Sequence, residues 1–363
     1  MRREQSRGAC ADGDPTRIPL IHTTDLYHPP QDPDDHIDLA TAAALPEYDL
    51  KAVILDPTEK YLSEKLSRGL VRRKPGFRAV TSLAEILARS IPVAAGPMQP
   101  LKSPIDDIAD RPATEQSGIR LLLETLEESN EKVVISVVGS ARILAAAFNR
   151  SPGLVRSKVS SVLLNAGSLA GPKKEWNVDL DPHAYICLWN SGLPIRWYPC
   201  ATERGSSDPN HEHGTYWHTS HAAIFKSLSR GFRGWFTEEF SAGLNDERRD
   251  STNAQRSWER ILNEERNMWS TASLVMAAGR VLARMSEGWR FIPSEAVGGE
   301  RVWQWELEPI AATVNADAIV EWKPAREGGV ALLFRRELGA EYATAMSEAL
   351  CALLGTIPDK PGD

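Results

Sequence analysis

Short apolar runs alternate with segments of helical periodicity over the first two hundred residues of the chain. The runs have the length of buried strands, and a helix-like segment separates each from the next. Strands joined through helices pair in parallel, because the helix carries the chain back to the starting edge of the sheet. The pattern predicts an α/β fold with a mostly parallel sheet of six or more strands flanked by helices, the strands being 18–21, 52–55, 91–94, 133–138, 161–164 and 193–198.

The pattern changes after residue 200. A polar loop is followed by aromatic-rich helical segments as far as about residue 285, and residues 303–336 predict β-hairpins with a turn at Gly328-Gly329. Residues 341–354 predict a closing helix. We expect four parts: a disordered polar leader (1–16), an α/β core (17–200), a helical and loop cap that completes the functional site (201–300), and a C-terminal β-hairpin and helix packed on the core (301–363).

Composition limits the class of protein. With 363 residues and 42% apolar residues, the chain can bury a substantial core without covalent staples. The 4 cysteines are widely spaced and form no CxxC pair, which argues against a disulfide framework or a zinc ribbon and favours a reducing cytoplasm. We expect neither an export signal nor a membrane span, because no apolar run reaches the necessary length. A net charge of -7 disfavours nucleic acid as a partner.

The most informative segment is residues 23–45, which places carboxylates between an apolar strand and an apolar helix. In open α/β sheets the carboxyl edge of the strands is where ligands bind. Carboxylates crowded together repel one another unless a cation compensates them, and oxygen ligands suit a hard divalent cation. The segment therefore predicts a divalent metal site built from some of Asp25, Asp32, Asp34, Asp35 and Asp38.

This segment resembles the N-terminal signature of the inosine-uridine preferring nucleoside hydrolases, in which a strand leads into Asp-Thr-Asp, a turn, an Asp-Asp pair and an Ala/Leu-rich helix. Thr24-Asp25 matches the first part and Asp34-Asp35 the pair. Four more stretches resemble the family's motifs in the same order: 91–100, 134–139, 162–167 and 175–184. The resemblance covers residues 18–200 and implies the nucleoside hydrolase fold.

The resemblance also implies roles for individual residues. Asp25, Asp35 and the carbonyl of Val138 would hold the metal, which is Ca2+ in the family and could be Mg2+ or Mn2+ here. Asp25 would also act as the base that activates water, and Asp34 would combine a catalytic role with sugar binding. The other expected substrate-binding residues from the matching motifs are Asn165, Glu175, Asn177 and Asp181.

Three departures from the family pattern affect the expected reaction. Ser270 stands where the fourth metal ligand should be aspartate, and Trp269 replaces the companion histidine. A neutral hydroxyl is a weaker ligand than a carboxylate. The turn after Asp25 is longer than usual and adds His28, which could bind substrate. The asparagine expected after the second strand is also missing, and Asp56 follows the strand instead.

Residues 208–221 form a second segment with candidate functional side chains, and it is rich in histidine. His213 could protonate a leaving group, and Arg204 and His218 could bind a substrate phosphate. Zinc binding and a solvated loop remain alternatives. The aromatic residues beyond position 215 are expected mostly in the core, although one or two could stack on a purine.

Together these features predict a metal-dependent enzyme acting at the anomeric carbon of a nucleoside, nucleotide or nucleotide-sugar. Hydrolysis is the reaction that the resemblance implies. One alternative is a flavin-independent mutase that interconverts pyranose and furanose forms of a nucleotide-sugar, and another is a non-catalytic nucleotide or sugar binder, motivated by Ser270. No dinucleotide-binding glycine fingerprint is present, so neither FAD nor NAD is expected. The resemblance implies a homodimer or homotetramer.

Overall fold

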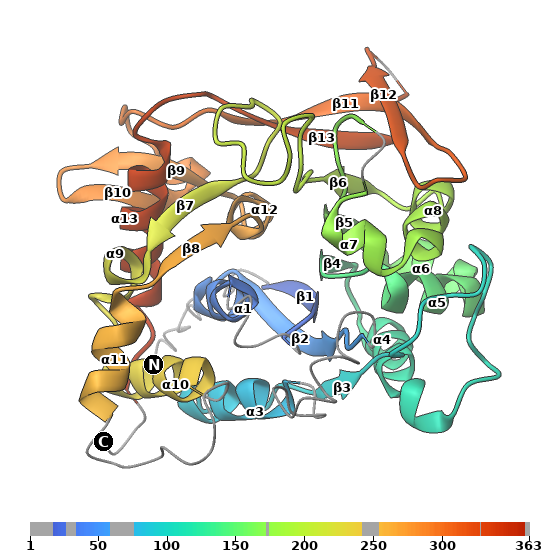
Figure 1. Cartoon of the computed structure of the whole chain (residues 1–363), viewed down its shortest axis with the longest axis horizontal. Helices are drawn as coiled ribbons and strands as arrows, with labels where there is room; N and C mark the ends of the chain where they lie inside the picture. The colour runs from blue at the N-terminus through green and yellow to red at the C-terminus, as the bar shows by residue number, and fades with distance from the viewer. Residues whose placement is uncertain are drawn as a thin grey trace, which may run out of the picture.

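A nine-stranded sheet forms the centre of the computed structural model, which describes residues 17–26, 34–58, 76–171, 174–241, 254–326 and 328–359. The strand order is β12-β11-β13-β6-β5-β4-β1-β2-β3 (Figure 1). The first six strands all pair in parallel, as the alternation of strands and helices predicts. They are β1 (Ile18–Thr24), β2 (Tyr48–Leu55), β3 (Val93–Ala95), β4 (Val133–Val138), β5 (Val159–Asn165) and β6 (Ile195–Trp197).

Three C-terminal strands extend this sheet. Strand β13 (Ala331–Arg336) pairs in parallel with β6 and antiparallel with β11 (Trp305–Val314), which in turn pairs antiparallel with β12 (Val320–Pro324). The expected hairpins are therefore present, and they belong to the main sheet. Gly328 lies between β12 and β13 with a φ of 69°, a conformation that glycine adopts without strain.

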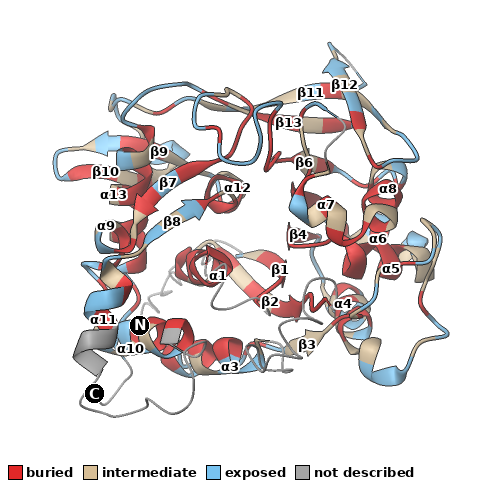
Figure 2. Ribbon diagram, viewed as in Figure 1, coloured by how far each residue is buried: buried red, intermediate tan, exposed pale blue. Residues whose placement is uncertain are grey.

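Helices cover both faces of the sheet because neighbouring strand residues point to opposite sides. Leu20 packs in one apolar cluster and Ile21 in the other. The Ile21 face is covered by α4 (Ser117–Glu128), α5 (Arg142–Arg150), α6 (Pro152–Lys158), α7 (Trp176–Leu180) and α8 (Pro182–Asn190). Burial is concentrated along these strands and the inner sides of the helices (Figure 2).

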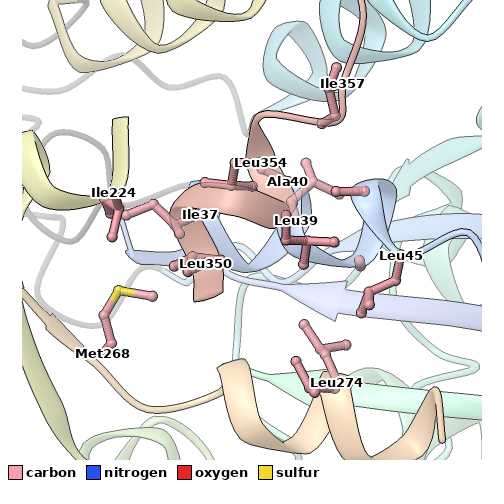
Figure 3. Packing of buried hydrophobic residues seen from close by; sticks show 14 of the residues in the cluster. Ile37, Leu39, Ala40, Leu45, Ile224, Met268, Leu274, Leu350, Leu354 and Ile357 are labelled. Atoms are coloured by element: carbon pink, nitrogen blue, oxygen red, sulfur yellow. The ribbon is translucent and has the colours of Figure 1, made fainter. Parts of the chain in front are cut away.

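The Leu20 face is covered by α1 (Asp34–Ala44), α3 (Phe77–Ile86) and α13 (Tyr342–Leu354). Helix α1 ends before Pro46, as the sequence predicts, since proline cannot continue a helix. Helix α13 lies against α1, with Ile37, Leu39, Leu350 and Leu354 in the shared apolar cluster (Figure 3). Within the described part of the chain, no helix combines the length and apolarity that crossing a membrane requires.

The segment between β6 and β11 is less helical than the sequence suggests. It contains α9 (His221–Phe225), α10 (Arg230–Ser241), α11 (Ala254–Leu262) and α12 (Thr271–Ala277). It also contains two antiparallel pairs: β7 (Trp217–Ser220) with β8 (Glu265–Met268), and β9 (Arg280–Met285) with β10 (Gly288–Pro293). The expectation of helices through residue 285 is wrong there, because each ribbon depends on a partner strand that local periodicity does not reveal.

Candidate active site

A cavity of about 360 Å³ lies at the carboxyl edge of the parallel strands. Strand register explains why its residues meet. Thr24 of β1 pairs with Leu55 of β2, and Thr23 pairs with Val137 of β4, so these strands end together. The residues that follow them therefore converge at one edge. The polar side chains lining the cavity from this edge and from the helices that begin there are Asp25, Asp34, Asp35, Glu175 and Asn177.

Three aspartates give the cavity its negative charge. Asp25 follows β1, and Asp34 and Asp35 form the first turn of α1, where the positive end of the helix dipole favours carboxylates. Their side chains are nearly buried, with exposed fractions of 7%, 7% and 4%. Carboxylate oxygens of Asp34, Asp35 and Asp38 lie within 4.8 Å of one another. Such crowding of buried carboxylates fits a divalent cation, because it is costly without a compensating positive charge.

The Val138-Gly139 turn brings the backbone of β4 to the same place. Val138 lines the cavity, and Gly139 has a φ of 107°. A Cβ at Gly139 would lie 3.0 Å from Oδ2 of Asp56 and 3.2 Å from Cβ of Asp25. Only glycine gives this turn its conformation and its close approach to Asp25 together. The carbonyl of Val138 is thus held beside the aspartates.

Glu175 and Asn177 close another side of the cavity. Glu175 caps α7: its carboxylate accepts hydrogen bonds from the backbone N–H groups of Gly167 (2.8 Å), Asn177 (3.0 Å) and Val178 (3.4 Å). Burial raises the pKa of Glu175, and these hydrogen bonds oppose the rise. Nδ2 of Asn177 donates to the carbonyl of Asn165 at 3.0 Å. Both side chains are therefore oriented by the backbone around β5.

Ser270 and Trp269 line the cavity from the start of α12. Ser270 is the N-cap residue of that helix, but its side chain makes no capping hydrogen bond. Nε1 of Trp269 donates to the carbonyl of Ser206 at 2.8 Å, and the Trp269 ring lies 5.6 Å from that of Tyr216. The indole is therefore held in place. Trp176 also lines the cavity and is 48% exposed.

Asp181 and Asn165, both expected to bind substrate, do not line this cavity and are engaged in internal hydrogen bonds. Oδ2 of Asp181 forms a fully buried ion pair with Nε of Arg142 at 2.9 Å and accepts from the backbone N–H of Leu101. Nδ2 of Asn165 donates to the carbonyls of Val137 and Leu163 at 3.2 Å. The structure gives both residues contacts that hold strands and loops together.

The basic residues of the expected cap also lie away from the lining. Nε2 of His213 is 3.2 Å from Oε2 of Glu308, and its ring lies 5.3 Å from that of Trp322, beside the C-terminal strands. His218 is exposed on β7 and bonds Glu265 and Asn267. Arg204 is exposed in the loop after β6. His28 and residues 1–16 lie outside the described residues.

Sequence reasoning gave no role to Cys200, Ser206 or Trp176, all of which line the cavity. Burial, followed by the nearby carboxylates of Glu175 and Asp34, raises the pKa of the Cys200 thiol well above its usual value, so the thiol is neutral. Asp56 departs from the family pattern, and the sequence alone gives it no role. Its Oδ2 accepts from the backbone N–H of Ser140 at 2.7 Å, and burial raises its pKa to about 7. Its position directly after β2 was the available signal.

Solved structures with the same fold include nucleoside hydrolases. A purine-preferring ribonucleoside hydrolase from Gardnerella vaginalis superposes with a TM-score of 0.54 at 12% identity, covering 93% of this chain and 98% of that one. The effector protein XOO4466 superposes with a TM-score of 0.53 at 16% identity, covering 95% of each chain. At these identities the likeness establishes the fold alone.

Sequence comparison identifies the family. The pyrimidine-specific ribonucleoside hydrolase RihA of Escherichia coli is 29% identical over 199 residues, which is 49% of this chain and 58% of that protein. RihA of Salmonella paratyphi B is 30% identical over a stretch of the same length. The chain therefore covers less than two thirds of these relatives. The family model for inosine-uridine preferring nucleoside hydrolases matches residues 31–254, more than half of the chain. The chain belongs to the inosine-uridine preferring nucleoside hydrolase family.

Proposed function

We propose that this protein hydrolyses the N-glycosidic bond of an uncharged nucleoside with the help of a bound divalent cation. The observation that carries the proposal is the single cavity that collects Asp25, Asp34, Asp35, Glu175 and Asn177 at the carboxyl edge of the sheet. Family membership and fold support a glycosyl-bond hydrolase. In the reaction, water attacks C1′ of the sugar while the bond from C1′ to the base nitrogen breaks, and the departing nitrogen keeps the bonding electron pair and takes up a proton from solvent.

The proposed metal ligands are Asp25, Asp35, the Val138 carbonyl and Ser270, all of which line the cavity and offer oxygen atoms. Ca2+ or Mg2+ bound there would orient the sugar hydroxyls and make the attacking water more acidic. Asp25 would accept a proton from the attacking water. Asp25 follows β1, is nearly buried and lines the cavity together with the other proposed ligands.

Asp34, Glu175 and Asn177 are the proposed contacts of the sugar hydroxyls. Backbone N–H groups orient the Glu175 carboxylate, and Asn177 is anchored by its bond to the Asn165 carbonyl. Side chains that are fixed before substrate arrives lose little entropy on binding. They can also hold C1′ at a constant distance from Asp25, the proposed catalytic base. Such fixed positioning lowers the entropic part of the activation barrier.

The remaining walls suit an aromatic, uncharged leaving group. Trp176 and Trp269 offer indole rings to a planar base. Among the described residues that line the cavity there is no lysine, arginine or histidine. A phosphate would therefore meet carboxylates with no basic side chain from the described lining to bind it, which favours a nucleoside over a nucleotide or a nucleotide-sugar. His213 and His218 have no part in this proposal because they do not line the cavity.

The test is to incubate the purified protein with nucleosides, nucleotides and nucleotide-sugars. Each substrate is tried with EDTA and with added Ca2+, Mg2+ or Mn2+, and products are identified by NMR. We expect free base from nucleosides in the presence of metal and none with EDTA. A product of unchanged mass with a new anomeric signal would replace hydrolysis with a mutase reaction. Ligand binding in EDTA without turnover on any substrate would indicate a non-catalytic binder.

Variants assign the reaction to the cavity. Asp25→Asn and Asp35→Asn should each lower the metal content, and turnover should fall by about 100-fold, as it does on loss of a catalytic group. Asp317→Asn is the matched control, because Asp317 is exposed and remote from the cavity. If both cavity variants keep full metal content and turnover, the assignment of the site is wrong.

A further inference from the structure

A second cavity, of about 400 Å³, lies at the opposite edge of the sheet and carries three arginines. Arg17 precedes β1, Arg89 follows α3, and Arg280 begins β9. The cavity shares no residue with the proposed active site. Arg17 and Asp25 lie at the two ends of β1, roughly 25 Å apart for an extended strand of this length.

Two of these arginines lack an anionic partner among the described residues. Nε and Nη2 of Arg89 are buried and have no hydrogen-bond acceptor within the described ranges. Burial, followed by the charge of Arg17, lowers the pKa of Arg89. The carboxylate of Asp49 acts in the opposite direction on the pKa of Arg89, but Asp49 forms its ion pair with Lys51. Arg17 and Arg89 thus bring two positive charges to one cavity, and an anion bound there would compensate them.

Arg280 differs because its charge is already balanced. Its Nε bonds Oε1 of Glu47 at 2.7 Å, and its Nη1 donates to the carbonyl of Phe291 at 2.7 Å. This arginine is therefore a fixed part of the wall. Glu47 compensates one of the three positive charges, and the described residues lining the cavity include no aspartate or glutamate. The cavity keeps an excess of two positive charges.

The rest of the wall is largely apolar. Leu45 follows α1, Leu87 follows α3, and Ile357 follows α13. Leu45 and Ile357 belong to the apolar cluster between α1 and α13 (Figure 3). An inorganic ion alone would leave this apolar surface in contact with water. A molecule with an oxyanion at one end and an apolar body would satisfy both parts of the cavity.

We propose that this cavity binds a small organic oxyanion, a phosphate or a carboxylate, whose charged oxygens lie between Arg17 and Arg89. Planar guanidinium groups bind such oxyanions through paired N–H donors, and Arg17 and Arg89 both line the cavity. The apolar body of the ligand contacts Leu45, Leu87 and Ile357.

Isothermal titration calorimetry of the full chain with phenyl phosphate and with benzoate, at constant ionic strength, tests the proposal. We expect saturable binding of at least one compound, and the stronger binder identifies the preferred head group. Arg17→Gln and Arg89→Gln should each weaken it at least tenfold. Arg120→Gln, which removes an exposed arginine of α4, is the control and should leave the affinity unchanged.

A further variant keeps both arginines. Ala43→Glu places a carboxylate on the cavity wall beside them and should abolish binding while the melting temperature shows that the protein is folded. Equal affinity of the original protein and of both glutamine variants would overturn the proposal, as would the absence of binding heat for both compounds. Release of base from nucleosides is measured separately, so failure of this proposal is distinguishable from failure of the proposed hydrolysis.

Discussion

Arg142 and Asp181 form an ion pair in which both side chains are completely buried, with Nε and Oδ2 2.9 Å apart. The other guanidinium nitrogens of Arg142 donate to the carbonyls of Pro57, Pro97 and Leu180. Asp181 also caps α8 through the N–H of Ala184. The pair therefore ties the loops after β2 and β3 to the start of α8, behind the cavity.

Removal of one partner of this pair should destabilise the protein strongly. Asp181→Ala leaves the Arg142 charge buried and uncompensated, which costs about 3–5 kcal/mol of unfolding free energy. Urea denaturation followed by circular dichroism measures the loss. Asp110→Ala, at an exposed ion pair with Lys102, should change little. A variant of Asp181 with full stability but no substrate binding would restore the substrate-binding role that the family motif suggests.

Replacement of Gly139 should damage both stability and turnover. Gly139→Ala forces a side chain into a φ of 107° and against Asp56 and Asp25, at a cost of about 1–3 kcal/mol. The shifted turn also displaces the Val138 carbonyl, so turnover should fall. Gly153→Ala is the control: it lies in α6 with open space around it and should be neutral or slightly stabilising. Normal stability and turnover in Gly139→Ala would show that the turn is adaptable.

The serine at position 270 should limit metal affinity. Ser270→Asp adds a negative charge where it lines the cavity with Asp25 and Asp35, so Ca2+ should bind about tenfold more tightly, or about 1.4 kcal/mol. Calorimetric titration with Ca2+ gives the comparison. Ser157→Asp adds the same charge on the exposed side of α6 and should have no effect. Equal Ca2+ affinity in both variants would place Ser270 outside the metal site.

Stability should fall in mild acid because of His22. This side chain is fully buried, neither ring nitrogen has a hydrogen-bond partner among the described residues, and burial lowers its pKa to about 4. The unfolded chain takes up the proton first, near its ordinary pKa of 6.5. The contribution of neutral His22 is therefore complete above that pKa and is lost as the pH falls towards about 4. By about pH 5 the loss is about 2 kcal/mol.

Urea denaturation at about pH 7 and about pH 5 measures this dependence. His22→Leu removes the titrating group and should make the difference between the two pH values about 2 kcal/mol smaller. His36 and His221, whose pKa values are also lowered by burial, should account for part of what remains. An unchanged difference in His22→Leu would mean that His22 titrates normally in the folded protein.

The sequence predicts the parallel half of the sheet well, since strands such as 133–138 and 159–165 contain short apolar runs and are separated by helices. It also locates Asp25, Asp34 and Asp35, because residues that follow a strand or begin the next helix must lie at the carboxyl edge. It fails for the β7–β8 and β9–β10 ribbons, whose pairing joins residues far apart in the chain or around a turn. Residue type alone could not separate His213, bound to Glu308, from a catalytic histidine.

By itself, then, the sequence determined the family, the α/β alternation and the acidic turn before α1, because each depends on residues close together in the chain. Only the tertiary structure decided which polar side chains face the cavity and which form hydrogen bonds or ion pairs inside the protein. Asp181 and Glu175 belong to one short motif, yet Asp181 pairs with Arg142 in the interior while Glu175 lines the cavity. That difference arises from contacts between segments distant in sequence, and no local pattern encodes it.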